Sequence, residues 1–300
     1  EYSTDGGTTY PNQIVAATSA ATGVYAWTVP DAIGSQLRVK ITDVGNASVS
    51  DASEANFTIK GALALTAPNG GEIWAVGSSQ NITWNRTGSV ANVKLEYSTN
   101  GGTSYANTII ESTSASTGTY PWSIPDAIGN QLRVRLSDTT NPTVEDASDA
   151  NFTIRGSLRV SAPNGGEQWG VGTSQNITWV RNGSIATVKL EYSTDGGTTY
   201  PNTITASTDA ATGSYPWPIP DAINSTTKVR VTSTADSEVY DVSDVNFKIV
   251  GVLNLVAPNG GEDWGVNTAQ NVTRTMSGSI SNVRLDYSTN GFTTSSPIIA

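Results

Sequence analysis

The residues best placed to do chemistry form a short polar run that recurs along the chain. Asp5 stands among Ser and Thr hydroxyls beside two glycines, and the same twelve letters, EYSTDGGTTYPN, return at 191–202. A carboxylate in such surroundings could act as a general acid or base. Two further copies carry Asn100 and Asn290 in its place, and an amide cannot take that role. We predict that the run is a hairpin turn, in which Asp or Asn bonds its own backbone and glycine supplies positive φ.

Residues 3–10 of this run resemble the Asp box, S-x-D-x-G-x-T-W/Y, of sialidases and other secreted proteins. In sialidases the box lies away from the active site, so the resemblance implies no catalytic role for Asp5. The chain also has no His and no Cys, which excludes disulfides, imidazole or thiolate metal sites and His-dependent catalysis. We predict that the chain is not an enzyme and, apart from the calcium considered next, has no cofactor.

Recurrent carboxylates offer a second kind of chemistry, because Ca²⁺ takes about six to eight oxygen ligands and could stiffen a junction between domains. Acidic pairs recur late in each repeat unit, with a further acid in each GGE turn and each PDA turn. No D-x-D-x-D loop is present, and Asp in turns commonly caps the backbone, so calcium binding and capping both stay open. The candidate calcium ligands are Asp146, Asp149, Asp241, Asp244 and Glu167.

The chain also carries nine N-x-S/T sequons, which are candidate sites for N-glycosylation. Where the middle residue points inward, as we expect for Ile82 and Phe152, the flanking Asn and Thr point to solvent, where a glycan could be attached. A chain rich in Asn, Ser and Thr also makes sequons by chance, so both interpretations stay open. The sequons are at Asn46, Asn56, Asn81, Asn85, Asn151, Asn176, Asn182, Asn224 and Asn271.

The Trp and Tyr residues could form a platform on which sugars stack. Strand alternation places Tyr120 and Trp122 with Ile124 on one face, which indicates core packing instead. Trp74 follows a turn, and we keep it as the one candidate for an exposed or junctional position.

The composition indicates a globular chain with a polar, weakly charged surface. Of the 300 residues 37% are hydrophobic, including eight Trp, and 14% are charged, with a net charge of -10. An acidic chain of this kind disfavours nucleic acid and anionic membrane surfaces as partners. No apolar run approaches about 18 residues, so we expect no membrane span in this segment.

An ungapped repeat of 95 residues organises the chain. The phrase APNGGE begins at positions 67, 162 and 257, and recurrent Trp, Tyr and Phe keep the same interval. A unit of this length exceeds a propeller blade or solenoid turn, at roughly 20–50 residues, and matches a small domain. The predicted units are 1–60, the C-terminal part of a repeat; 61–155 and 156–250, two complete repeats; and 251–300, the N-terminal part of a repeat.

The two partial units raise the question of what completes them, because half a β-sandwich exposes its core and its strand edges. One interpretation is that the sequence is a window on a longer tandem array. The other is a head-to-tail polymer, in which the last unit of one chain is completed by the first unit of the next through strand exchange. We favour the tandem array, and under either interpretation the expected partner is the repeat itself.

The repeat unit is expected to be all-β. Within 61–155, β-branched and aromatic residues recur with period two in about seven segments, separated by turns roughly every 8 to 12 residues. This pattern predicts tandem immunoglobulin-like or fibronectin-III-like β-sandwich domains. Because proline cannot donate to a strand ladder, the segment with Pro121 and Pro125 should lie at a sheet edge or interrupt its pairing there.

Charged residues alternate with the apolar ones on two of the expected strands. If the strand of Lys94 and Glu96 neighbours the strand of Arg133 and Arg135, their side chains are expected to pair across the strands. Each exposed pair of this kind adds only about a few tenths of a kcal/mol to the free energy of unfolding. The pairs therefore favour solubility more than stability.

The motifs P-N-G-G-E-x-W, Q-N-I-T-W, V-K-L-E-Y-S-T-N-G-G, Y-P-W-x-I-P-D and S-D-A-N-F-T-I recur in order along the chain, with small variations between copies. Together they resemble the immunoglobulin-like repeat of fungal Ser/Thr-rich cell-wall proteins of the Kre9/Knh1 type and of long bacterial surface proteins. The resemblance covers every repeat and implies a cell-wall or cell-surface module without known catalysis. Arg274 departs from the pattern, since it replaces Trp84 and Trp179, and a guanidinium at a core position is costly unless it reaches solvent or a carboxylate.

The sequence therefore predicts a structural component of an extracellular fibre, stalk or surface layer built from tandem domains, located outside the cell or at its surface. The junctions carry this prediction, because no Pro/Ser/Gly-rich spacer separates one unit from the next. The alternatives are an adhesin or carbohydrate-binding array, with a cell-wall or surface glycan as partner, and a non-catalytic spacer of a larger secreted protein.

Overall fold

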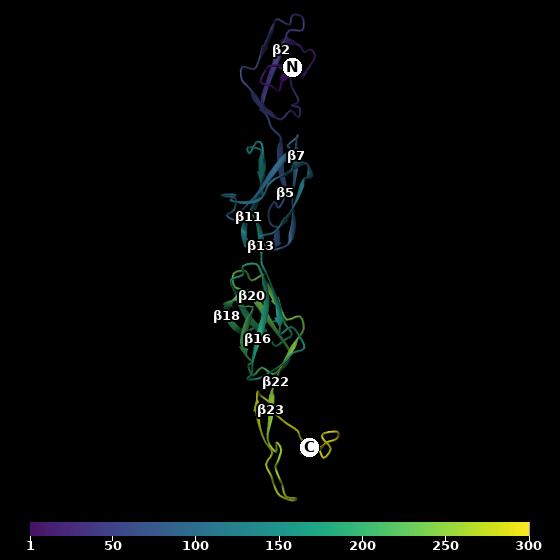
Figure 1. Cartoon of the computed structure of the whole chain (residues 1–300), viewed down its shortest axis with the longest axis vertical. Helices are drawn as coiled ribbons and strands as arrows, with labels where there is room; N and C mark the ends of the chain where they lie inside the picture. The colour runs from purple at the N-terminus through teal and green to yellow at the C-terminus, as the bar shows by residue number, and fades with distance from the viewer. Residues whose placement is uncertain (300) are drawn as a thin grey trace. The chain divides into compact units, whose positions relative to one another are not determined.

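The computed structural model describes residues 1–299 and is built almost wholly of β-strands (Figure 1). Contacts within the chain divide it into two compact units, Glu1–Arg155 and a second unit that begins at Gly156. The described helices are the single 3-10 turns η1 (Ala20–Thr22), η2 (Ala115–Thr117) and η3 (Ala210–Thr212). None of them has the length or apolar character to cross a membrane.

In the first unit, residues 61–155 form two facing sheets, here called sandwich one. One sheet has the strand order β10-β7-β5, and the other has the order β6-β13-β11-β8-β9, with β12 paired to β11. The strands are β5 (Ala62–Ala67), β6 (Ile73–Ala75), β7 (Ser79–Thr87), β8 (Asn92–Ser98), β9 (Asn107–Ser114), β10 (Thr119–Ser123), β11 (Gly129–Asp138), β12 (Glu145–Ala147) and β13 (Phe152–Arg155).

In the second unit, residues 156–250 form sandwich two with the same arrangement. Its sheets have the orders β14-β16-β19 and β15-β22-β20-β17-β18, with β21 paired to β20. The strands are β14 (Ser157–Ala162), β15 (Gln168–Gly170), β16 (Ser174–Asn182), β17 (Thr187–Ser193), β18 (Asn202–Asp209), β19 (Ser214–Pro218), β20 (Asn224–Ser233), β21 (Tyr240–Val242) and β22 (Phe247–Val250).

The strand order is that of an immunoglobulin-like sandwich. The first strand, β5, pairs antiparallel with β7 in one sheet, whereas the short β6 belongs to the other sheet and runs parallel to β13. The remaining strands pair antiparallel, as in the two sheets of immunoglobulin domains. The predicted fold class, all-β with immunoglobulin-like or fibronectin-III-like sandwiches, is thereby confirmed.

The inward positions of each sandwich form its core, as the alternation predicts. Leu95, Val134 and Phe152 of the larger sheet are fully buried, and Ile82 and Trp84 face them from the smaller one. Fully burying side chains of this kind stabilises a fold by roughly 1.5–3 kcal/mol each. The core of sandwich two holds the counterparts Leu190, Val229, Phe247, Ile177 and Trp179.

The proline-containing segment lies at an edge. Among the described residues β10 pairs with β7 alone, where Pro121 stands opposite Asn81. Because Pro121 lies on a strand with one neighbour, its lack of an N–H costs no hydrogen bond between central strands. The prediction of an edge position is confirmed.

The residues outside the two sandwiches form smaller sheets. Residues 1–60 contain β1 (Tyr2–Ser3), β2 (Gly34–Thr42), β3 (Ser50–Ala52) and β4 (Phe57–Ile59), with Leu37 and Ile59 buried. Residues 251–299 contain β23 (Val252–Ala257), β24 (Thr273–Ser277), β25 (Leu285–Tyr287) and β26 (Ser296–Ile299).

Arg274, which stands at a core Trp position of the repeat, lies on β24 opposite Leu255. Its side chain is exposed to solvent.

Candidate functional site

The repeated polar run forms the hairpin turn between β8 and β9 and again between β17 and β18. In the second copy, Ser193 Oγ donates to Asp195 Oδ1 (2.6 Å), and Gly197 N donates to Ser193 Oγ (2.9 Å). Thr199 donates from its N to Asp195 Oδ1 (3.0 Å) and from its Oγ1 to Asp195 Oδ2 (2.6 Å). The bonds from Ser193 and Thr199 hold the pKa of Asp195 well below its usual range. The carboxylate is thus bound within its own turn, as predicted.

Asn100 serves the same turn in sandwich one. Its Oδ1 accepts from Ser98 Oγ (2.7 Å) and from Ser104 N (3.0 Å). Its Nδ2 donates to Ser104 Oγ (3.0 Å), where Asp195 accepts from Thr199. An amide therefore replaces the carboxylate without loss of the turn.

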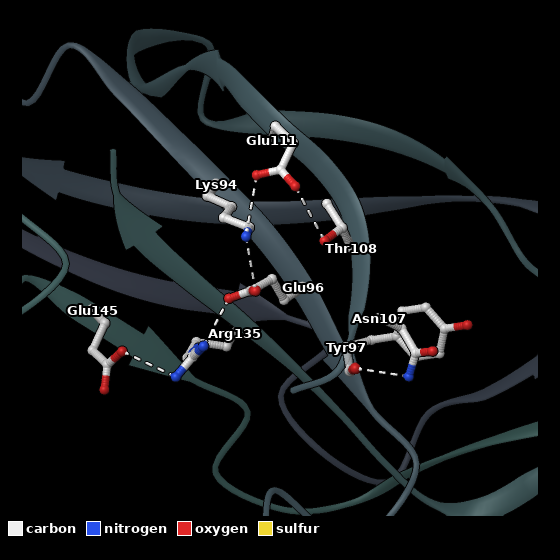
Figure 2. A network of polar contacts seen from close by, with 8 residues as sticks. All are labelled: Lys94, Glu96, Tyr97, Asn107, Thr108, Glu111, Arg135 and Glu145. Carbon is white, nitrogen blue, oxygen red and sulfur yellow. Dashed lines mark hydrogen bonds and ion pairs between the residues drawn. The ribbon is translucent and has the colours of Figure 1, made fainter. Parts of the chain in front are cut away.

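A chain of charged side chains crosses the outer face of β9, β8 and β11 in sandwich one (Figure 2). Lys94 Nζ lies 3.1 Å from Glu111 Oε2 on β9 and 3.1 Å from Glu96 Oε1 on its own strand. On the far side of Glu96, Arg135 Nη2 lies 2.8 Å from Oε2, and Arg135 Nη1 reaches Glu145 on β12 at 3.5 Å. Glu96 and Arg135 are directly opposed in the ladder, so the expected cross-strand pairing is confirmed for these two residues. Arg133 lies opposite Ser98 and does not take part in it.

Glu96 lies deeper than an outward-facing residue is expected to lie, with only 8% of its surface exposed. Burial opposes ionisation of its carboxyl, but bonds from Arg135 and Lys94 outweigh the burial and lower its pKa below the usual value. Glu191 repeats the arrangement in sandwich two, between Lys189 (2.6 Å) and Arg230 (2.8 Å), with its pKa also lowered.

Two carboxylates of this network are missing from sandwich two. Ala206 stands at the position of Glu111, and Tyr240 stands at the position of Glu145. Arg230 therefore places both Nε (3.2 Å) and Nη2 (2.8 Å) on the single oxygen Oε2 of Glu191. Its Cζ lies 4.5 Å from the centre of the Tyr200 ring, much as Arg135 lies 4.7 Å from that of Tyr105.

A third substitution leaves a buried amide oxygen without a partner. In sandwich one, Arg133 Nε donates to Asn151 Oδ1 (2.8 Å). Sandwich two has Lys228 at this position, and its Nζ donates instead to the carbonyl oxygen of Asp244 (3.0 Å). The oxygen Oδ1 of Asn246, the counterpart of Asn151, finds no partner among the described residues.

The candidate calcium ligands are each engaged with a neighbouring loop or strand. The Oδ2 atom of Asp146 accepts from Leu65 N, and that of Asp241 accepts from Val160 N, both at 2.7 Å. Glu167 caps the PNGG turn by accepting from Asn164 N and Gly165 N, both at 2.8 Å.

The remaining two calcium candidates bond side chains of the PNGG turns. Asp149 accepts from Asn69 Nδ2 (2.7 Å), and Asp244 accepts from Asn164 Nδ2 (2.8 Å). Within residues 1–299, no three acidic side chains gather in a group that could hold a metal ion. Each candidate carboxylate therefore accepts a hydrogen bond from a backbone N–H or from an Asn side chain.

The sequons lie mostly at the surface, as expected where the middle residue points inward. The exposed asparagines are Asn46, Asn56, Asn81, Asn85, Asn176, Asn182 and Asn271. Asn151 and Asn224 are half-buried, and Asn151 Oδ1 accepts the bond from Arg133. A glycan at Asn151 would therefore disturb a structural contact, and so would one at Asn56, whose Oδ1 accepts from Arg38 Nε (2.8 Å).

Trp74 is buried, so the expectation that it lies exposed or at a junction is wrong, and its counterpart Trp169 is buried as well. Each is 8% exposed. Because β6 pairs with β13, with Trp74 opposite Ile154, the indole lies over the core with its ring centre 5.1 Å from that of Phe152. The neighbouring Ile73 faces solvent instead, and neither Trp74 nor Trp169 offers a surface for sugar stacking.

A specific contact joins residues 1–60 to sandwich one within the first unit. The Asp31 carboxylate accepts from Ser89 N (2.9 Å) through Oδ1 and from Ser89 Oγ through Oδ2. Gly61 lies beside this bond, where a Cβ atom would stand 2.5 Å from Val90 and 3.1 Å from Ile33. The close approach of these apolar side chains requires glycine at position 61. We call this group the junction contact.

The second unit contains the same junction contact between sandwich two and residues 251–299. Asp221 accepts from Ser279 N (2.9 Å) and from Ser279 Oγ. A Cβ atom at Gly251 would stand 2.6 Å from Ile280 and 3.3 Å from Ile223. A depression of about 490 Å³ lies beside this bond and is lined in part by Asp221, Ile223 and Ser279.

In both junction contacts the hydrogen bonds from Ser favour the ionised carboxylate. The side chain and backbone of Ser89 lower the pKa of Asp31, and those of Ser279 lower the pKa of Asp221. In the sequence, Asp31 and Asp221 stand out only as the acids of PDA turns. A Gly-Ser pair at 88–89 and 278–279 keeps the same spacing from them and is the signal that could have indicated the contact.

Comparison with known proteins adds no family assignment. No protein-family model matches the sequence, and no curated protein matches it. Among solved structures, fibronectin(III)-like modules of Clostridium thermocellum CbhA are similar over 62% of this chain and 93% of theirs, with 17% identity and a TM-score of 0.23. The match to the N-terminal four immunoglobulin domains of Dscam1 isoform 6.44 covers 71% of this chain and 54% of that one, with 10% identity and a TM-score of 0.32. By the strand order of its own two sandwiches, the chain has the immunoglobulin-like and fibronectin-III-like fold.

Proposed function

We propose that this protein is a structural component of an extracellular fibre, stalk or surface layer, built from tandem immunoglobulin-like domains and without catalytic activity. The junction contact is the observation that carries the proposal. Successive domains within a unit are held by a charged hydrogen bond, from Ser89 to Asp31 and from Ser279 to Asp221, and by apolar packing around a required glycine.

The length of the connection supports the same function. One residue, Gly251, separates the end of β22 at Val250 from the start of β23 at Val252. A link of this length cannot behave as a flexible coil. Because each repetition of one junction repeats one rotation and one rise, an array with this junction would form a regular fibre or layer.

The surface chemistry supports a location outside the cell. Most of the sequon asparagines are exposed, and the surface is dominated by Ser, Thr, Asn and Gly rather than by charge. The resemblance of the sequence motifs to the repeat of Ser/Thr-rich cell-wall proteins and of long bacterial surface proteins points to the same location. Under this proposal the partner of each repeat is the next repeat.

Electron microscopy of material from the native source tests the proposal. Filaments or layers whose period matches one domain or a multiple of it are the expected result, because one junction is reused along the array. Isolated domains on floppy connections would contradict it. In full-length chains with Asp31→Ala and Asp221→Ala together, the domains should become more variably oriented while both sandwiches stay folded.

A further inference from the structure

A cavity of about 270 Å³ opens beside the hairpin turn of sandwich two. It is concave and small compared with the roughly 300–1,000 Å³ of sites for drug-sized ligands, so it suits a single small ring. Two aromatic rings and two cations contribute to its wall, together with the glycines of the turn. The lining residues are Gly196, Gly197, Thr198, Tyr200, Lys228, Arg230, Tyr240 and Val242.

The cavity wall carries positive charge on a chain that is acidic as a whole. In sandwich one, the three cations Lys94, Arg133 and Arg135 are accompanied by three carboxylates, those of Glu96, Glu111 and Glu145. In sandwich two, the cations persist as Lys189, Lys228 and Arg230, but Glu191 is the one carboxylate of that set that remains. Lys189 and Arg230 thereby lose one carboxylate each and share Glu191. Lys228 donates to the uncharged carbonyl oxygen of Asp244, as Arg133 donates to the amide of Asn151, so the cavity wall keeps an excess of positive charge that favours an anionic ligand.

The geometry of the aromatic rings adds a second requirement for the ligand. The Tyr200 ring holds the Arg230 guanidinium at 4.5 Å, which fixes a planar donor at the wall of the cavity. Tyr240 is 54% exposed at a position where sandwich one has Glu145. Gly197 permits the close packing, since a Cβ atom there would stand 3.0 Å from Tyr200 Oη and 3.2 Å from Lys228 Cδ.

We propose that Tyr200, Lys228, Arg230 and Tyr240 form a binding site for one carboxylated sugar unit of an acidic polysaccharide. The carboxylate would pair with Lys228 and Arg230, and the C–H face of the sugar ring would stack on the exposed ring of Tyr240. A glycan is favoured over an acidic peptide because the site combines two cations with the flat, exposed aromatic face of Tyr240. The site goes beyond the structural role, and binding there does not require assembly.

Titration calorimetry of the full chain with tetragalacturonic acid at low ionic strength tests the site. Tyr240→Glu rebuilds the arrangement of sandwich one, so the fold should persist while the affinity falls by about tenfold or more. Tyr240→Phe retains the ring and should bind within about twofold of the natural protein. The matched gain variant, Glu111→Ala with Glu145→Tyr in sandwich one, should add one further equivalent of bound tetramer.

Two comparison probes separate the possible ligands. The fully methyl-esterified tetramer, which lacks the charge, should bind at least about tenfold more weakly. A tetraglutamate peptide has the same charge without sugar rings, and affinity equal to that of tetragalacturonate would overturn the proposal in favour of an acidic peptide. Absence of binding at millimolar concentration, or equal binding by Tyr240→Glu with unchanged thermal unfolding, would also overturn it.

Discussion

At the scale of single residues, the two sandwiches form a natural comparison, because most contacts are the same and a few differ. Glu96 and Glu191 are both held between a lysine and an arginine, whereas the surrounding carboxylates differ. Asp195 and Asn100 support the same turn with a charged and a neutral side chain. The residue differences therefore mark where one domain departs from the common design. Lys228 and Tyr240 lie on β20 and β21, whereas Ala206 lies on β18.

The unpartnered amide of Asn246 gives a direct test at this scale. Lys228→Arg should restore the bond that Arg133 donates to Asn151 and stabilise sandwich two by about 1 kcal/mol, since a buried acceptor gains its partner. Urea unfolding followed by Trp fluorescence measures the change.

The reverse substitution in sandwich one is the matched control for that test. Arg133→Lys should destabilise sandwich one by a similar amount, because it leaves Asn151 Oδ1 without its donor. If Lys228→Arg had no effect, or destabilised the chain, the bond between the guanidinium and the amide would not be the cause of the difference.

At the scale of elements, glycine at the start of each domain is set by close packing. A Cβ atom at Gly61 would stand 2.9 Å from the carbonyl oxygen of Thr87 and 2.5 Å from Val90, so the backbone has to shift to admit it. We expect Gly61→Ala to destabilise the first unit by roughly 1–3 kcal/mol. Denaturant unfolding of the full chain measures this.

Gly129→Ala is the control for that substitution, because the nearest atom to its Cβ would be Leu132 Cδ1 at 3.7 Å, an ordinary contact. Its effect should stay within about 1 kcal/mol of the natural chain. Equal effects of the two substitutions would contradict a packing role for Gly61.

The strands themselves could be predicted from the sequence, because long segments such as β7 and β11 alternate apolar and polar residues with period two. The edge position of β10 followed from Pro121, and the pairing of Glu96 with Arg135 followed from strand neighbourhood. The burial of Trp74 could not be predicted, since three-residue β6 is too short to display alternation and its parallel pairing with β13 is a long-range contact.

The candidate sites were predicted less completely than the fold. The turn role of Asp195 follows from its own neighbours in sequence, so it was predicted. The bond between Asp31 and Ser89 joins residues 58 apart in different repeats, and the cavity at Tyr240 depends on three strands that meet only in the folded sheet. Such contacts become visible once the register of the strands is known.

At the scale of the whole molecule, successive domains within each unit are joined by a closed contact rather than by a free linker. In both units the Ser bonds lower the pKa of the junction Asp, so the ionised carboxylate stabilises the contact. This stabilisation is fully present above the usual Asp pKa of about 4. It is lost as the pH falls through the lowered pKa that the Asp carboxyl has in the closed contact. The contact is therefore expected to open in acid.

The most direct test is an NMR pH titration of the Asp31 and Asp221 side-chain carboxyl carbons in the full chain. Both should titrate below the usual Asp value of about 3.9, and Ser89→Ala and Ser279→Ala should raise the pKa of their partners towards it. Titration of both carboxyls at the usual value in the natural chain, with no response to either substitution, would contradict the closed junction and with it the proposed array.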